Sequence, residues 1–372
     1  MRTFIILLSL VTIPATAQKL PAKAKNVILF LADAGGLGAV NAASIHGYDK
    51  PQSLFIQSWP HIGLSDTSTA SQWVSDSAAG MSAIVTGVKT HNGVISMGPD
   101  TVRGKQDGAR LKTLLMYAEE NGLSTGVMTN VNVADATPAA CYANANDRRK
   151  YGEIIQQAFA PKFGDGPDVL MGIGRSAIEK SLAEQSLSLD ALSQKHHRKV
   201  YAALADVPPS EARPIVIQEK DMDIPAAAEQ ALARLSRNGK GFFLMIEWDA
   251  HTNNPQRGLD NLVGFDKLIR HIASKVDPNE TLLIFTADHS FDISTRGGKR
   301  GEPLLAGLDD WKQKNAGQST KLVELPALRV NDNHTGEEVV AAAMGPGADR
   351  IHGFFPNTRI FDTILAAYGW KR

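Results

Sequence analysis

Residues 26–32 (NVILFLA) limit the possible folds of this chain more than any other segment. They form a continuous apolar run with β-branched residues, and the run ends at Asp33. An apolar run without polar alternation is typical of a strand buried on both faces, as in a parallel sheet. Glycines follow Asp33, but their spacing does not match the G-x-G-x-x-G of a dinucleotide-binding loop, so we reject that function.

Further segments of both kinds follow along the chain. The sequence predicts strands at residues 124–130, 168–171, 242–248, 281–287 and 339–343, and helices at residues 109–121, 142–159, 225–237, 258–276 and 358–368. The strand–helix–strand unit over 242–287 requires a right-handed crossover between parallel strands. We therefore predict an α/β fold with a doubly wound, mostly parallel central sheet and helices on both faces. Residues 18–372 are expected to form a single domain with loop insertions at about 175–220 and 290–335.

The composition and the N-terminus bear on location and partners. The 372 residues contain 39 Lys and Arg and 39 Asp and Glu, so nothing favours nucleic acid or an anionic membrane as the main partner. Residues 1–17 combine one basic residue, a short apolar run and a small-x-small site at Ala15-Thr16-Ala17, which predicts a cleaved signal peptide. An uncleaved anchor is the alternative, but the apolar run is short for a bilayer. We expect a periplasmic or secreted protein with no membrane contact after cleavage.

A second informative stretch is residues 73–80 (WVSDSAAG), which continues to Thr86-Gly87-Val88-Lys89-Thr90. The small residues predict a tight turn that opens a helix with Ser77 at or near its N-terminus. Free backbone N–H groups at such a position suit an anion, above all phosphate. No Gly-x-Ser-x-Gly surrounds Ser77, so a histidine base of the hydrolase type is not indicated.

Polar side chains follow four predicted strands. They are Asp33; Asp135 and Thr137; Glu247, Asp249 and His251; and Asp288 and His289. Parallel strands bring such groups to one edge of the sheet, where ligands bind. Any single acid could be a helix N-cap, but the whole set predicts a metal site. Asp and His suit zinc, whereas Asp, Glu and Thr suit magnesium, and His334 is a further candidate ligand.

Five segments together resemble the alkaline phosphatase family: residues 26–33, 74–80 with 86–90, 135–140, 286–289 and 334–336, in the family's order. The resemblance implies that Ser77 is a nucleophile that becomes phosphorylated. It implies that Asp33, Asp288 and His289 hold one zinc ion, and that Asp33 bridges to a magnesium ion held also by Thr137 and Glu247. Arg148 stands at the position of the phosphate-binding arginine, where a planar guanidinium can bind two phosphate oxygens. Its neighbour Arg149 is interpreted as a surface residue.

The chain departs from the family pattern at the second zinc, because the segment 247–254 is shorter than in the best-known members. We assign Asp249, His251 and His334 to this ion, with Asn253 as the alternative to His251. The short chain also predicts that large accessory insertions are absent. Because family members are often dimers, a homodimer is a further expectation.

The implied reaction is hydrolysis of small phosphate monoesters through a phosphoserine, with two Zn²⁺ and one Mg²⁺ and an alkaline optimum. A phosphodiesterase or nucleotide pyrophosphatase on the same metal core is the main alternative, but these commonly use Thr and lack the Arg. A sulfatase would need a modified Cys or Ser in its own motif. A non-catalytic periplasmic phosphate or metal binder is the alternative from another class. Trp73 and Trp248 could contact the leaving group, although core packing is the favoured role for each.

Overall fold

The computed structural model describes residues 23–318 and 321–372, so the signal peptide expected at residues 1–17 lies outside the described residues. A ten-stranded sheet forms the centre, in the order β13-β2-β12-β8-β1-β7-β3-β4-β6-β5. The strands are β1 (Asn26–Asp33), β2 (His61–Asp66), β3 (Ser124–Asn132), β4 (Val169–Ile173), β5 (Val200–Tyr201), β6 (Ile215–Gln218), β7 (Phe242–Asp249), β8 (Thr281–Thr286), β12 (Val339–Met344) and β13 (Gly353–Pro356). Every neighbouring pair is parallel except the two pairs that contain β12.

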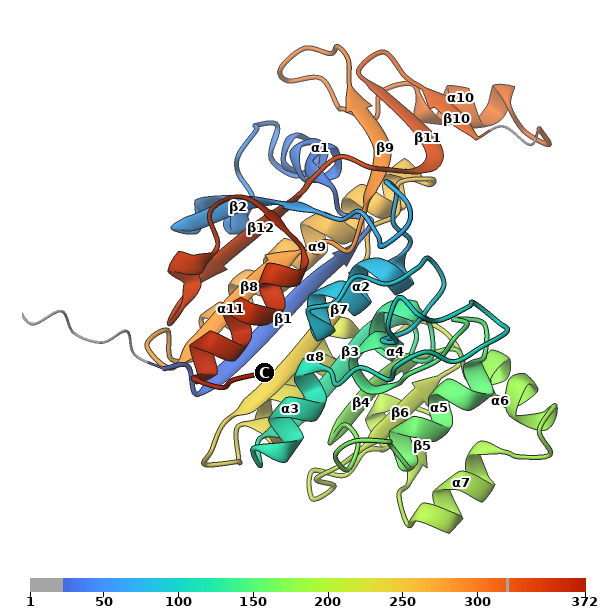
Figure 1. Cartoon of the computed structure of the whole chain (residues 1–372). Coiled ribbons are helices and arrows are strands. Elements are labelled where there is room, and N and C mark those ends of the chain that lie inside the picture. The colour runs from blue at the N-terminus through green and yellow to red at the C-terminus, as the bar shows by residue number, and fades with distance from the viewer. Residues whose placement is uncertain (1–22, 319–320) are drawn as a thin grey trace, which may run out of the picture.

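Helices cover both faces of this sheet (Figure 1). One face packs against α1 (Leu37–Tyr48), α8 (Ile224–Leu235) and α9 (Pro255–Ala273). The other packs against α2 (Ser77–Thr86), α3 (Leu114–Glu120), α4 (Ala136–Tyr142), α5 (Tyr151–Phe159), α6 (Arg175–Ala183), α7 (Leu189–His196) and α11 (Thr358–Tyr368). Short 3-10 turns lie at Phe55–Ser58, Leu204–Asp206 and Ala348–Arg350.

The first strand shows why an unbroken apolar run was required. β1 lies between β7 and β8, and its side chains alternate between two cores. Ile28, Phe30 and Ala32 enter one core, and Val27, Leu29 and Leu31 enter the other. A strand covered by helices on both faces has no solvent side that a polar residue could occupy. The predicted α/β class with a doubly wound, mostly parallel sheet is confirmed.

The segment expected to be loop-rich, residues 290–335, differs from expectation. It forms a second, antiparallel sheet in the order β10-β11-β9, built from β9 (Ser290–Thr295), β10 (Leu322–Glu324) and β11 (Leu328–Thr335), with α10 (Leu308–Lys314) beside it. These elements stand at the top right of Figure 1. Alternate residues of β9 and β11, such as Phe291, Ile293 and Val330, are buried against the core that contains α1 and α9. The glycines and charges between the strands concealed this alternation in the sequence.

Two helix predictions were also inaccurate. The helix expected at 142–159 is divided into α4 and α5, and residues 143–150 between them are not helical. Asn144 prevents continuity, because its side chain donates hydrogen bonds to the carbonyls of Ser96 and Leu111. The helix expected at 109–121 begins only at Leu114, where the Thr113 hydroxyl caps it by accepting from the Met116 N–H. Side-chain bonds to the backbone compete with helix formation in this way.

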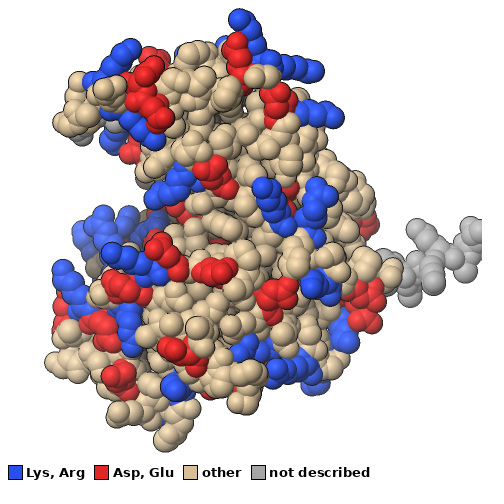
Figure 2. All heavy atoms as spheres, turned by 180° about the vertical axis from the view of Figure 1, so that it is seen from behind, with Lys and Arg blue, Asp and Glu red and all other residues tan. Residues whose placement is uncertain are grey.

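Charges on the face shown in Figure 2 are mixed, with Lys and Arg interspersed among Asp and Glu. This agrees with a formal net charge of zero. Within residues 23–318 and 321–372, no helix has the length and apolar character needed to span a bilayer.

Candidate active site

Four neighbouring parallel strands of the sheet, β8, β1, β7 and β3, bring the predicted polar groups to one edge. Asp33 is the last residue of β1 and is paired in register with Asp249, the last residue of β7. Glu247 lies two residues earlier on β7, opposite Leu31. Asp288 and His289 follow one residue after the end of β8, and Thr137 lies in the first turn of α4, just after β3. The edge is therefore set by the parallel register of strands far apart in sequence.

Ser77 begins α2, as the sequence predicted, and its hydroxyl points to this edge. Asp76 caps the helix by accepting a hydrogen bond from the Ala79 N–H. The Ser77 Oγ lies 3.4 Å from Asp33 Oδ1 and 3.3 Å from His289 Nε2. The run of small residues allows close packing, since a Cβ on Gly80 would come within 2.2 Å of the Asp288 carbonyl oxygen.

Two groups of side chains have the spacing needed to hold a metal ion. Asp33, Asp288 and His289 form one, and His251, His289 and His334 form the other, with the ligand atoms of each group within 4.8 Å of one another. His289 belongs to both groups. The first group is the set predicted for one zinc ion, and the second brings together the two histidines predicted for the other. Asn253, the alternative to His251, is exposed and accepts a hydrogen bond from the Asn254 N–H.

The hydrogen bonds of the three histidines prepare them as ligands. Nδ1 of His289 lies 3.0 Å from the Ser290 carbonyl, and Nδ1 of His334 lies 2.9 Å from the Ser75 carbonyl. A carbonyl can only accept, so each Nδ1 carries a proton, and Nε2 is the ring nitrogen left to face a metal ion. His251 Nδ1 contacts the Asp249 carboxylate at 2.8 Å, which has the same effect. Metal-binding histidines are fixed by such second bonds.

Asp249, predicted as a further ligand of the second ion, lies in neither group, and its role as a direct ligand stays a prediction. One of its carboxylate oxygens contacts His251 Nδ1, and the other lies 3.4 Å from Arg257. Because the segment is short, Asp249 and His251 stand only two residues apart and contact each other. The sequence could place both residues on one side of the segment, but it could not show this contact.

Glu247 and Thr137 lie beside the first group. Glu247 is fully buried, and neither of its carboxylate oxygens has a hydrogen-bond partner. Burial and the neighbouring Asp33 carboxylate raise the pKa of Glu247 well above its usual value, with Thr129 acting in the opposite direction. Burial and Asp33 also raise the pKa of Asp288 to about 6. Thr137 Oγ1 lies 3.5 Å from Asp288 Oδ2. A buried, unpartnered carboxylate among other carboxylates is the environment that a divalent cation stabilises.

Arg148 stands in the non-helical segment between α4 and α5, at the mouth of the site. One terminal nitrogen lies 3.1 Å from Asp76 and the other 3.0 Å from Asp135. These two carboxylates raise the pKa of Arg148, overcoming the effect of burial. This contact of Arg148 with two carboxylates was not predicted from the sequence, although Asp76 and Asp135 both stand at helix starts. Arg149 is exposed, as predicted.

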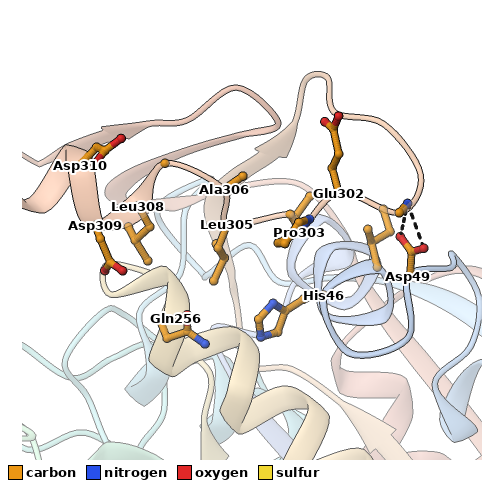
Figure 3. A pocket seen from close by; sticks show the side chains of 14 residues that line it. His46, Asp49, Gln256, Glu302, Pro303, Leu305, Ala306, Leu308, Asp309 and Asp310 are labelled. Atoms are coloured by element: carbon orange, nitrogen blue, oxygen red, sulfur yellow. Dashed lines mark hydrogen bonds between the residues drawn. The ribbon is translucent and has the colours of Figure 1, made fainter.

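A separate cavity of about 640 Å³ lies between the end of α1, the start of α9 and residues 301–310 (Figure 3). Its lining includes the acidic residues Asp49, Glu302, Asp309 and Asp310, and none of the predicted site residues. Asp49 is already engaged, because both of its carboxylate oxygens accept from the Gly301 N–H. The candidate active site is therefore not this cavity.

A nucleophile at a helix start, beside clustered carboxylates and histidines at the carboxyl edge of a parallel sheet, defines the class as a metal-assisted hydrolase of the α/β type. Comparison with known proteins then identifies the family. The model of the family described as Alkaline phosphatase matches residues 24–198 and 217–323, so this chain belongs to the alkaline phosphatase family and is a phosphatase.

Individual relatives are distant but cover most of the chain. The chain is 28% identical to the streptomycin-6-phosphate phosphatase of Streptomyces griseus, over 98% of this chain and 96% of that protein. It is 27% identical to alkaline phosphatase 4 of Bacillus subtilis, over 77% of this chain and 74% of that protein. The solved alkaline phosphatase of the Antarctic bacterium TAB5 has a TM-score of 0.74 at 22% identity, covering 95% of this chain and all of that one, which supports the fold.

Proposed function

We propose that this chain hydrolyses phosphate monoesters through a phosphoserine formed on Ser77. The observation that carries the proposal is the convergence of the Ser77 hydroxyl with Asp33 and His289, at 3.4 Å and 3.3 Å, beside groups that can hold metal ions. In the first step Ser77 Oγ attacks phosphorus in line, the ester P–O bond breaks and the alcohol leaves. In the second step water attacks the phosphoserine, which releases inorganic phosphate and restores Ser77.

The donor atoms support two zinc ions and one magnesium ion. Asp33, Asp288 and His289 would hold one zinc; His251 and His334, with Asp249 bound to His251, would serve the other. Asp33, Thr137 and Glu247 offer only oxygen atoms, which suits magnesium. When bound, such ions lower the pKa of hydroxyl groups and stabilise developing negative charge on oxygen.

Arg148 would bind the phosphoryl oxygens. Asp76 and Asp135 engage two of its N–H groups, and a guanidinium has five, so donors remain for an incoming phosphate. The carboxylates also hold the guanidinium at a fixed angle, which reduces the entropy lost when substrate binds. Ser77 is at the N-terminus of α2, where backbone N–H groups add a further attraction for an anion.

The experiment compares p-nitrophenyl phosphate turnover by the wild type, Ser77→Ala and Ser71→Ala, with metal content measured on each sample. Ser71 lies on the same chain segment, but its exposed side chain bonds to His91. We expect Ser77→Ala to lose at least about 10³-fold in kcat with its metal content unchanged, and Ser71→Ala to retain activity. Wild type that binds metal but turns over no monoester would support a binding protein instead. A higher rate with bis(p-nitrophenyl) phosphate would support the phosphodiesterase alternative.

We also propose that residues 1–17 export the protein to the periplasm or the medium, and that residues 18–372 fold as one domain. A mature N-terminus at residue 18 in the exported protein would support cleavage. A homodimer stays a prediction, which light scattering of the purified protein would check.

A further inference from the structure

Trp73 is the most exposed large hydrophobic side chain within residues 23–318 and 321–372. Its exposed fraction is 87%, so core packing, the role favoured from sequence, is wrong for this residue. Trp248 behaves as expected, because its ring packs against Phe265. An exposed tryptophan forfeits the large favourable free energy of burying its ring. The exposure of the Trp73 ring is therefore explained by its position, four residues before Ser77.

The main chain that carries Trp73 is held in place. Asn92 accepts from the Asp76 N–H at 2.9 Å and donates to the Val74 carbonyl at 3.0 Å. His334 contacts the Ser75 carbonyl on the same segment. The Trp73 carbonyl lies so close to Gly336 that a Cβ there would come within 3.1 Å of it. The backbone is thus fixed from two sides while the indole ring stays free, which is the arrangement of a preformed contact surface.

The distance from Trp73 to the nucleophile is limited by the chain. Four residues span at most about 14 Å, even when fully extended. Groups around Ser77 are charged or polar and would engage the phosphoryl oxygens, so the leaving group of a monoester must extend away from them. Trp73 and the adjoining Val74, itself 36% exposed, offer apolar surface within reach of such a group.

We propose that Trp73 stacks on a flat aromatic ring in the leaving group of the substrate, and so selects aryl-type phosphate monoesters over aliphatic ones. This rests on the proposed function. A planar ring gains from an aromatic face in a way that a flexible polyol does not. The ring could belong to an aryl phosphate or to the base of a nucleoside monophosphate, which share this chemistry.

The test measures kcat and KM for 1-naphthyl phosphate, adenosine monophosphate and glycerol 2-phosphate. The variants are Trp73→Ala, Trp73→Phe and the control Phe354→Ala. Phe354 is also highly exposed, at 73%, but it lies on β13, four strands away from β1. We expect Trp73→Ala to raise KM for at least one ring-bearing substrate by about 5- to 30-fold, with kcat nearly unchanged. KM for glycerol 2-phosphate should stay within about twofold, Trp73→Phe should recover most of the loss, and Phe354→Ala should have no effect.

The pattern of substrates identifies the source of the ring. A change confined to naphthyl phosphate indicates aryl phosphates, and a change confined to adenosine monophosphate indicates nucleotides. Equal changes for all three substrates, or no change for any, would overturn the proposal. Binding gives a readout independent of turnover: phenylphosphonate should bind the wild type more tightly than Trp73→Ala, and methylphosphonate should bind both equally. If the wild type hydrolyses none of the three monoesters, the proposed function fails, whereas the comparison of phenylphosphonate with methylphosphonate binding still tests the stacking.

Discussion

Both ends of the central sheet gather charged side chains, but these side chains have different partners at the two ends. At the amino ends of β3, β4 and β6, acids meet arginines and backbone N–H groups. Arg213 pairs with Asp165 and Asp168 at 2.9 Å each, and Glu119 accepts from the N–H groups of Asp165 and Gly166. At the carboxyl ends of β1, β7 and β8, the buried Glu247 carboxylate has no cationic partner among the described residues, and Thr129 is the one neighbour named above that lowers its pKa.

This difference distinguishes charges that stabilise the fold, at the amino edge, from charges that serve the function, at the carboxyl edge. Paired and hydrogen-bonded charges at the amino edge are explained by the fold itself. The carboxyl edge collects Asp33, Glu247 and Asp288 in a buried place, where burial first and the Asp33 charge second raise the pKa of the latter two. Such a cluster is complete only when a cation from outside the chain joins it. Removing metals should therefore affect one edge and leave the other unchanged.

The largest effect is expected from chelation. Metal-free enzyme should lose at least about 10³-fold in activity, because Ser77 and the phosphate would lose their electrostatic partners. Ligands present at about a thousand times their Kd stabilise by about 4 kcal/mol, so the melting temperature should fall by roughly 5 to 10 °C. Activity assays and thermal unfolding after dialysis against a chelator, and again after adding zinc and magnesium, measure both. Full activity in a sample shown to contain no metal would contradict the assignment.

Exchanging arginine for lysine should have opposite consequences at the two edges. Arg148→Lys keeps the charge but loses the planar pair of donors, so kcat/KM should fall by about 10- to 100-fold with little change in stability. Arg213→Lys, its matched control at the amino edge, should lower the melting temperature by a few degrees and leave kcat/KM unchanged. Steady-state kinetics and thermal unfolding of both variants test this prediction. Equal activities for Arg148→Lys and wild type would remove Arg148 from phosphate binding.

Replacing the buried Glu247 by glutamine should shift the melting temperature in opposite directions with and without bound metal. Without metal, Glu247→Gln removes a carboxyl whose pKa is raised by burial and by Asp33, and so avoids the free-energy cost of burying that group. The variant should therefore melt a few degrees above the metal-free wild type. With metal, it lacks a ligand and should melt below the loaded wild type. Asp168→Asn at the amino edge should be destabilised to the same extent in both conditions, since its partners are Arg213 and the Thr125 N–H. A Glu247→Gln variant that melts below wild type in both conditions would mean that Glu247 supports the fold rather than a cation.

The sequence was sufficient for the central strands of the sheet and for most of the carboxyl edge, but it did not predict the strands β2, β5, β6 and β13 nearer the sheet's margins. Apolar runs such as 26–32 predict central strands, because strands buried on both faces tolerate no polar residue. The residues that follow such parallel strands then lie at the carboxyl edge of the sheet. Contacts made by short loops were not accessible in this way. The Asp249–His251 contact and the clamp of Asp76 and Asp135 on Arg148 depend on side-chain directions that spacing does not fix.

The sequence was least informative where local bonds compete with regular structure. The helix expected at 142–159 is interrupted because the Asn144 side chain binds backbone carbonyls outside it. The small sheet within 290–335 pairs β9 with β11, which are separated by a long connection, so no short turn motif in the sequence predicts their pairing. The exposure of Trp73 is likewise a property of its surroundings, because an aromatic residue between the polar Gln72 and the apolar Val74 is compatible with either a core or a surface position.

The smallest effect concerns pH at the amino edge. Burial and the nearby Asp165 raise the pKa of Glu119 from 4.5 to about 7. The folded state therefore holds this proton more tightly than the unfolded state. The contribution to stability is complete below pH 4.5, and it is lost as pH rises from there to about 7. Glu119→Gln should remove this part of the pH dependence, so between pH 5 and pH 8 the variant should lose less stability than wild type, by on the order of 1 kcal/mol.

Urea unfolding of metal-loaded wild type and Glu119→Gln at the two pH values measures this difference. The pH dependence that arises at the metal edge is common to both proteins and cancels when they are compared. The neighbouring Glu120 supplies the control, because it is exposed and pairs only with Lys112 on the surface, so Glu120→Gln should keep the wild-type pH dependence. If Glu119→Gln and wild type lose the same stability over this range, the Glu119 carboxyl ionises normally. The amino edge would then be more open to water than its hydrogen bonds indicate.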